Sequence, residues 1–279
     1  MSQIIENKTF DEERALYASD SIIVNNCKFD GPADGESALK ESKNVTVNNS
    51  FFNLRYPFWH DDNLIVDGCE LTKNCRAALW YTKDATIKNT KLHGIKALRE
   101  CANINIENCS IDSPEFGWSV RNISMKDTTV TSEYFMMRSD ALKFENVTLN
   151  GKYSFQYIDN SVLENCNFDT KDAFWHAKNT VIKNSVIKGE YLGWYCENVT
   201  FDNCKIIGTQ PLCYCKNLRL IDCEMIDADL AFEKSEVFAT IKTPVISIKN
   251  PAFGKIIVPR VDEIIKDDPM SKAAVEIEV

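Results

Sequence analysis

The chain lacks the features that mark a membrane protein or a nucleic-acid-binding protein. No apolar run in its 279 residues is long enough to span a bilayer. The opening segment, Met1 to Lys8, does not combine a basic stretch with an apolar one, so we expect no leader peptide and favour the cytoplasm. The formal net charge is −9, and an acidic protein is repelled by nucleic acid and by anionic lipid. We therefore expect neither nucleic acid nor a membrane as a partner.

Metal-binding patterns are also missing. The sequence has three histidines beside eleven cysteines, and Cys213 and Cys215 have the wrong spacing for a zinc knuckle. No group of aspartates typical of a calcium site is present. We expect no metal and no cofactor. Six cysteines instead occupy one repeat position where other copies have Ser, Thr or Val, which indicates reduced thiols that fill a narrow core: Cys27, Cys69, Cys109, Cys166, Cys204 and Cys223.

A short pattern that recurs every 19 residues predicts the fold. It reads Asn-h-x-h-x-Asn-Cys/Ser/Thr-x-h, where h is apolar, and eight successive copies begin at Asp84, Asn103, Asn122, Ala141, Asn160, Asn179, Asn198 and Asn217. Looser spacings extend it back to Ser21, Asn44 and Asn63 and forward to Val245. A constant period of about 20 residues with apolar alternation predicts a solenoid of short parallel strands, because helical repeats need about 30 residues or more.

The prediction is therefore an all-β, single-stranded parallel β-helix of about a dozen coils. We expect one domain over residues 1–279, with regular coils at about 15–255 and a C-terminal cap at 256–279. The fourth repeat position is apolar throughout and must point inward. The first and sixth positions are mostly Asn, which tolerates the left-handed backbone of a tight bend and can hydrogen-bond to the Asn of the next coil.

The part of each coil outside the repeated pattern varies more from copy to copy, and we expect the functional residues there. All five tryptophans lie four residues before a repeat start, in a column that also contains Arg99; we name this the Trp column, with Trp59, Trp80, Trp118, Trp175 and Trp194. The next position forms the His/Tyr/Arg column, with His60, Tyr81, Glu100, Arg138, Tyr157, His176, Tyr195 and Tyr214. The preceding column carries no charge and is predicted to be core.

The orientation of these two columns is left open by the pattern. Strict alternation would place the Trp column outside and the His/Tyr/Arg column inside, but a continuous interior line of charges is costly. A bend between the columns would let both face outward. Alternatively, the tryptophans fill the interior and only the His/Tyr/Arg column is exposed. In either case an exposed aromatic and polar surface runs along the coils, suited to sugar faces or to a protein partner.

The chain resembles the right-handed parallel β-helices of the pectate-lyase-like superfamily over about residues 20–255, through its period and its Asn columns. Segments such as Tyr56 to Asp61 and Tyr191 to Cys196 look like an uncharacterised bacterial β-helix family. The resemblance implies the fold and no established activity. Lyases and hydrolases of the superfamily use grouped aspartates with a Lys or Arg base, whereas here the carboxylates are scattered and form no close pair.

Three functional hypotheses follow. The first is non-catalytic binding of a carbohydrate or another elongated ligand along the two columns. The second is a carbohydrate-active enzyme of the lyase or hydrolase type, working near Arg99, Glu100, Arg138 and His176, although no catalytic residue can be assigned. The third is an interaction scaffold whose surface meets another protein, including a second copy of the chain as a homodimer.

Overall fold

The computed structural model describes residues 3–270 and 274–279, and it is built from short parallel strands. Within these residues the helical structure consists of one 3-10 turn, η1 (Lys73–Cys75). The chain divides into two compact units, Met1–Met136 and Met137–Val279. The predicted all-β parallel β-helix is confirmed in each unit.

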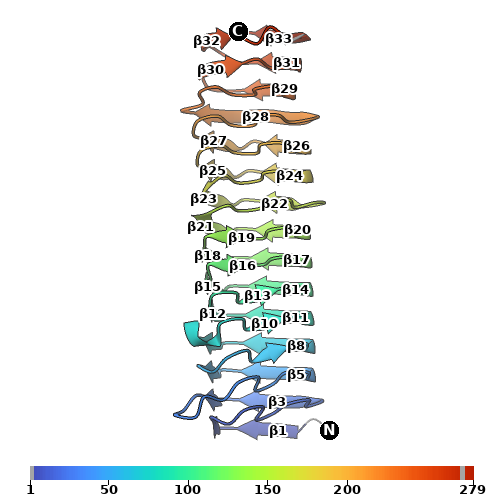
Figure 1. Ribbon diagram of the computed structural model, residues 1–279, viewed down its shortest axis with the longest axis vertical. Coiled ribbons are helices and arrows are strands. Elements are labelled where there is room, and N and C mark those ends of the chain that lie inside the picture. The colour runs from blue at the N-terminus through green and yellow to red at the C-terminus, as the bar shows by residue number, and fades with distance from the viewer. Residues whose placement is uncertain (1–2, 271–273) are drawn as a thin grey trace. The chain divides into compact units, whose positions relative to one another are not determined.

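In the N-terminal unit, one strand from each coil pairs in parallel with the corresponding strand of the next coil. Figure 1 shows these strands stacked one above another. They are β1 (Gln3–Glu6), β3 (Ile22–Asn25), β5 (Lys43–Asn48), β8 (Asp62–Asp67), β11 (Lys83–Lys88), β14 (Ala102–Glu107) and β17 (Arg121–Lys126). Partners such as Ile87 and Ile106 are 19 residues apart, so one sequence repeat corresponds to one coil.

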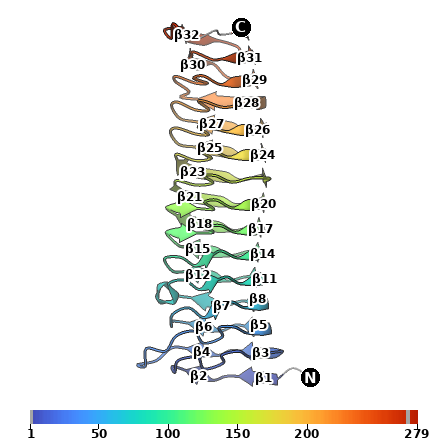
Figure 2. The ribbon, with the colours of Figure 1, turned by 45° about the vertical axis from the view of Figure 1, so that its right-hand side comes forward.

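The remaining strands of the N-terminal unit form two further faces. The second face, visible in Figure 2, contains β2 (Thr9–Phe10), β4 (Lys28–Phe29), β6 (Phe51–Phe52), β9 (Glu70–Leu71), β12 (Lys91–His93), β15 (Ser110–Asp112) and β18 (Thr129–Ser132). The third contains β7 (Phe58–Trp59), β10 (Leu79–Trp80) and β13 (Leu98–Arg99), followed by the pair β16 (Glu115–Phe116) and β19 (Tyr134–Phe135). The third face carries part of the Trp column.

The C-terminal unit repeats this arrangement. Its first face contains β20 (Asp140–Glu145), β22 (Val162–Glu164), β24 (Lys178–Lys183), β26 (Glu197–Asp202), β28 (Leu218–Ile226), β29 (Glu236–Ile241), β31 (Phe253–Ile257) and β33 (Ala274–Glu278). Its second face contains β21 (Thr148–Lys152), β23 (Asn167–Lys171), β25 (Val186–Lys188) and β27 (Lys205–Ile207). The strands β30 (Val245–Lys249) and β32 (Val261–Ile265) pair separately.

Regular pairing extends beyond the boundaries predicted for the coils. At the N-terminal end, β1 already pairs with β3, and at the C-terminal end β33 pairs with β31. The predicted cap at 256–279 therefore contains strands in the same parallel register. Prolines in this region break the sequence pattern without ending the pairing, because the ladder needs only the backbone groups of the residues between them.

The columns of the repeat define the core. Side chains at the fourth repeat position, such as Ile106 and Phe201, are fully buried, and so is the uncharged column that precedes the tryptophans. Phenylalanines stack between coils inside each unit, for example Phe29 on Phe52 with ring centroids 4.5 Å apart and Phe155 on Phe174 at 4.7 Å. This packing removes the apolar half of every coil from water and stabilises the fold.

Asparagines mark two bends of each coil. Asn103 and Asn108 have φ of 58° and 52°, in the left-handed region that Asn tolerates better than most residues. Their amides also link neighbouring coils: Asn122 Nδ2 donates to Asn103 Oδ1 at 2.8 Å, and Asn108 Nδ2 donates to Asn89 Oδ1 at 2.7 Å. Asn thus serves both the backbone conformation and the contact between coils.

Candidate functional site

A repeated bend separates the Trp column from the His/Tyr/Arg column. Members of the second column have positive φ, including His60 at 60°, Tyr81 at 60°, Tyr157 at 59° and Tyr195 at 60°. In the C-terminal unit the residue two positions earlier is left-handed as well, for example Phe155 at 60° and Phe174 at 61°. Because left-handed residues interrupt the in-and-out alternation, two successive side chains can both reach the surface. Such backbone costs on the order of 1 kcal/mol or more for a residue with a bulky side chain. The same cost recurs in successive coils.

The Trp column lies half-buried between core and solvent, which settles the question that alternation left open. Its indole N–H groups point along the surface to the next coil: Trp59 Nε1 donates to Ala77 O at 2.6 Å and Trp194 Nε1 to Gln210 O at 2.8 Å. Trp118 and Trp175 make equivalent bonds. The tryptophans therefore fasten adjacent coils together, and part of each ring remains accessible.

In the N-terminal unit, cations alternate with rings in the Trp column. The Arg99 guanidinium lies 5.2 Å from the Trp80 ring centroid and 5.1 Å from that of Trp118, and its Nε is 3.4 Å from a carboxylate oxygen of Glu100. Unlike the other four indoles, Trp80 Nε1 is buried and has no hydrogen-bond partner among the described residues. On the adjacent column, His60 stacks on Tyr81 at 4.8 Å. Arg99 is thereby held between two rings and one carboxylate.

In the C-terminal unit, the His/Tyr/Arg column forms one uninterrupted stack, which we name the aromatic stripe: Arg138, Tyr157, His176, Tyr195 and Tyr214. Arg138 lies over the Tyr157 ring at 5.7 Å. The next three centroid distances along the stack are 4.8, 4.9 and 4.9 Å, with interplanar angles of 7°, 7° and 15°. One member from each of five successive coils therefore meets the next.

One end of the aromatic stripe is tied to a carboxylate. The Tyr214 hydroxyl donates to Glu233 Oε2 at 3.2 Å, and the Lys249 ammonium lies 3.5 Å from the other oxygen of Glu233. Burial raises the pKa of the Tyr214 phenol to about 12, and the nearby Glu233 charge contributes to the same shift. Tyr214 therefore keeps its proton at neutral pH and anchors the stack.

The stacking decides which part of each ring a ligand can reach. Faces of Tyr157, His176 and Tyr195 are covered by their neighbours in the stack, yet Tyr157 is 47% exposed and Tyr195 is 45% exposed. A ligand inside the stripe therefore meets the edges of the rings. What the stripe offers is a regularly spaced row of hydroxyl and imidazole groups.

The residues suggested for catalysis are divided between the two units. Arg99 and Glu100 belong to the N-terminal unit, where they pair with each other. Arg138 and His176 belong to the C-terminal unit, where Tyr157 lies between them. Asp61, next to His60, is only 2% exposed and faces away from solvent.

Within residues 3–270 and 274–279, no group of three or more His, Cys, Asp or Glu residues could hold a metal ion. In the same residues, no helix is long and apolar enough to cross a membrane.

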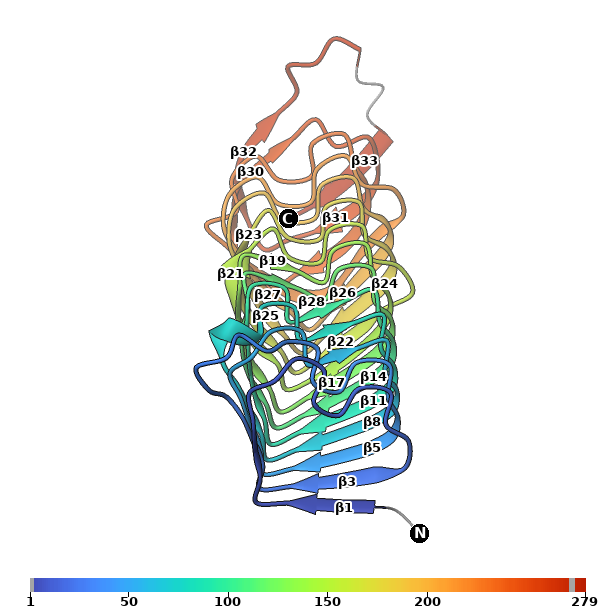
Figure 3. The ribbon, with the colours of Figure 1, turned by 60° about the horizontal axis from the view of Figure 1, so that its bottom comes forward.

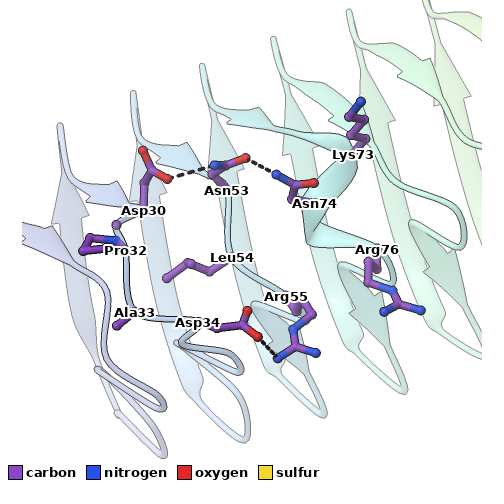
Figure 4. A pocket seen from close by; sticks show the side chains of 11 residues that line it. Asp30, Pro32, Ala33, Asp34, Asn53, Leu54, Arg55, Lys73, Asn74 and Arg76 are labelled. Carbon is purple, nitrogen blue, oxygen red and sulfur yellow. Dashed lines mark hydrogen bonds and ion pairs between the residues drawn. The ribbon is translucent and has the colours of Figure 1, made fainter.

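A second candidate site was missed from the sequence. In the N-terminal unit, the loop after β4 and the turn η1 leave the regular outline of the coils on the same side, as Figure 3 shows in blue and teal. Between them lies a groove of about 350 Å³ (Figure 4). The available signal was the looser spacing of the first repeats, because residues inserted into a coil become loops.

Comparison with known proteins supports the fold. No curated protein matches the chain. Among solved structures, a mutant tailspike protein of E. coli bacteriophage HK620 in complex with a hexasaccharide is 10% identical, with a TM-score of 0.50, and the match covers 98% of this chain and 71% of that one. The surface adhesin PfbA of Streptococcus pneumoniae is also 10% identical, with a TM-score of 0.40 over 79% of this chain and 71% of that one. A family model described as "Protein of unknown function (DUF3737)" matches residues 3–278, and the chain belongs to this family.

Proposed function

We propose that the aromatic stripe binds a carbohydrate chain without cleaving it. The observation that carries the proposal is the uninterrupted stack with a spacing of 4.8–4.9 Å between ring centroids. A ligand that runs along the coils meets a similar polar edge at each step. A chain of hydroxyl-bearing units has this character, because each hydroxyl can donate to and accept from a phenol or an imidazole.

The chemistry of the stripe favours binding over turnover. Tyr and His edges donate and accept hydrogen bonds, and Arg138 adds a fork of donors at one end. Glycoside hydrolysis usually needs two carboxyl groups on either side of the scissile bond. The carboxylate in contact with the stripe is Glu233, which accepts from Tyr214 and lies beside Lys249. The likeness in fold to a tailspike in complex with a hexasaccharide is consistent with this proposal.

Removing one phenol hydroxyl tests the proposal. Tyr195→Phe keeps the ring stack and removes one donor and acceptor, so we expect glycan affinity to fall by about three- to tenfold, the worth of roughly one hydrogen bond. The measurement is retention on a glycan array followed by titration of the best ligand with both proteins. Tyr195→Ala should weaken binding further.

The matched control is Phe238→Ala, which removes a ring that is 45% exposed on the first face of the same unit. It should leave glycan affinity unchanged. Absence of retained glycan on the array would contradict the proposal, as would equal effects of Tyr195→Phe and Phe238→Ala. Release of shortened products would indicate the enzyme hypothesis. A dimer in light scattering without glycan retention would indicate that a second copy is the partner.

We also propose that the protein works in a reducing compartment such as the cytoplasm, because all eleven cysteines are buried as free thiols. Burial raises the pKa of several of these thiols, that of Cys204 to about 12 and that of Cys166 to about 11. At pH 8 the native protein should react very slowly with a thiol reagent, since the thiolate is the reactive form. After denaturation without reductant, about eleven thiols should titrate. Several intact disulfides in protein from freshly lysed cells would contradict this.

A further inference from the structure

Two departures from the 19-residue period lie close together in the N-terminal unit. Repeat starts at Ser21 and Asn44 are 23 residues apart, four more than the period, and those at Asn63 and Asp84 are 21 apart, two more than the period. The first insertion is the loop after β4 and the second contains η1. Insertions in repeat proteins form loops on one face, and that face is often the one that binds.

The groove between these insertions has polar rims and an apolar centre. On one rim, Asn53 Nδ2 donates to Asp30 Oδ1 at 2.8 Å and Asn74 Nδ2 donates to Asn53 Oδ1 at 3.0 Å. Leu54, 8% exposed, lies between the rims (Figure 4). A volume of about 350 Å³ suits a molecule of monosaccharide size.

The opposite rim contains two guanidinium groups from neighbouring coils, Arg55 and Arg76, which point to the same side in Figure 4. Arg55 contacts Asp34 at 2.8 Å and Glu36 at 3.4 Å, so its charge is offset by the loop. Its Nε is buried and has no acceptor among the described residues.

Positive charge is in excess at this groove although the protein as a whole is acidic. Asp30 is paired with Lys28 at 3.0 Å. Among the residues that the structure describes, neither Arg76 nor Lys73 has a carboxylate partner, and both line the groove. An uncompensated pair of cations attracts anions.

The backbone of Arg76 is held in an unfavourable conformation, with φ of 55° and ψ of −88°. This residue ends η1, and its N–H donates to Lys73 O. Glycine would adopt this conformation more readily than arginine. The sequence has arginine where glycine would fold at lower cost, and this points to a use for the guanidinium.

We propose that the groove binds a small anion, a carboxylate or phosphate carried on a hydroxylated skeleton of monosaccharide size. Arg76 takes the oxyanion, Lys73 adds positive charge at the opposite end of η1, and the rim of Asn53 and Asn74 takes hydroxyl groups. This site is separate from the aromatic stripe and does not depend on it.

Titration of the full chain with four probes tests the proposal: inorganic phosphate, glucose 6-phosphate, glucuronate and glucose. We expect at least one of the two anionic sugars to bind more tightly than glucose, with binding weakened by added NaCl. The relative affinity of glucose 6-phosphate and glucuronate distinguishes phosphate from carboxylate as the preferred oxyanion. Failure of all four probes to bind, or glucose binding as tightly as the anionic sugars, would overturn the proposal.

The decisive variant is Arg76→Gly. It should weaken binding of the anionic sugar about tenfold or more, the worth of a charge-assisted hydrogen bond, while Tm stays the same or rises because the backbone strain is relieved. A residue with only a structural role would not combine these two effects. Lys83→Ala removes an exposed cation elsewhere in the same unit and should change affinity little. Equal affinities of wild type and Arg76→Gly would refute the site, and Tyr195→Phe should leave it unaffected.

Discussion

Asp61→Asn is expected to stabilise the protein, and more strongly at pH 8 than at pH 5. Asp61 is 2% exposed, and its Oδ1 accepts from Ser42 N at 3.0 Å. Its Oδ2 is buried and has no hydrogen-bond partner in the part of the chain that the structure describes. Burial raises the pKa of this carboxyl from 3.8 to about 8, and the Ser42 N–H only partly counteracts the shift. Asp61 is therefore largely protonated in the folded protein at neutral pH.

The sign of the pH dependence follows from the two pKa values. In the unfolded chain Asp61 ionises near pH 3.8, whereas in the folded protein it stays protonated until about pH 8. The contribution of Asp61 to stability is therefore most favourable below pH 3.8, and it decreases as the pH rises from 3.8 to about 8. Each pH unit inside the interval costs about 1.4 kcal/mol, so the loss between pH 5 and pH 8 is on the order of 3–4 kcal/mol.

Asparagine reproduces the shape of the protonated carboxyl without the titration. Its Oδ1 can accept from Ser42 N. Its amide can donate to a backbone carbonyl, as the Thr82 hydroxyl at the same repeat position of the next coil donates to Phe58 O at 2.5 Å. Urea unfolding of wild type and variant at pH 5 and pH 8 gives the difference directly, since other groups titrate equally in both. Asp62→Asn is the matched control, because Asp62 is exposed and its replacement should change stability by less than about 0.5 kcal/mol. A gain for Asp61→Asn that is the same at both pH values would show that Asp61 does not titrate in this range.

Asp61 also shows which parts of the structure the repeat could predict. It stands two residues before a repeat start, in a column of small residues that includes Ser42, Thr82 and Cys101, and the structure shows that this column is buried. The repeat correctly predicted burial of the apolar fourth position and of the uncharged column before the tryptophans. A strictly periodic chain repeats one environment per column, so composition of the column reveals its burial.

The stripe was harder to predict, because its exposure depends on the backbone conformation of the bend. Alternation would have placed Tyr157 and Tyr195 inside, and the bend that turns them outward contains two left-handed residues in each coil, Phe155 with Tyr157 and Gly193 with Tyr195. Tyr has no special preference for positive φ, so the residue type at this position does not indicate a bend, whereas Asn does at the other bends. The covering of ring faces by neighbouring rings is a further consequence of stacking that only the structure reveals.

The groove was not predicted for a different reason. It is formed where the period fails, with Asp34, Arg55 and Arg76 on one rim and Asp30, Asn53 and Asn74 on the other (Figure 4). Analysis of a repeat averages over its copies, whereas this site exists in a single place. Residues inserted between Ser21 and Asn44 and between Asn63 and Asp84 are the only sequence signal, and they give the location of loops without the groove between them.

The two neighbouring aromatic columns should respond very differently to truncation, and Trp194→Ala gives the larger effect. The Trp194 ring lies parallel to that of Trp175 at 5.4 Å, meets Tyr191 and Tyr214 edge-on at 5.6 Å, and its N–H donates to Gln210 O at 2.8 Å. Removing a half-buried ring with these contacts should lower the free energy of unfolding by about 2–4 kcal/mol. Tyr195→Ala removes a ring that is 45% exposed and should cost about 1 kcal/mol or less.

Trp194→Phe separates the two contributions of this tryptophan. Phenylalanine keeps an aromatic ring on Trp175 but cannot donate to Gln210 O, so it should recover most of the stability lost in Trp194→Ala and leave a deficit of about 1 kcal/mol, the worth of one hydrogen bond. Denaturant unfolding of Trp194→Ala, Trp194→Phe and Tyr195→Ala, together with glycan retention for each, tests the assignment. If the Trp column is structural and the aromatic stripe binds the ligand, Trp194→Ala should lower the free energy of unfolding and Tyr195→Ala should lower glycan affinity. If Trp194→Ala instead unfolds like wild type while losing its ligand, the tryptophans themselves form the binding surface, and the division of roles between the two columns is wrong.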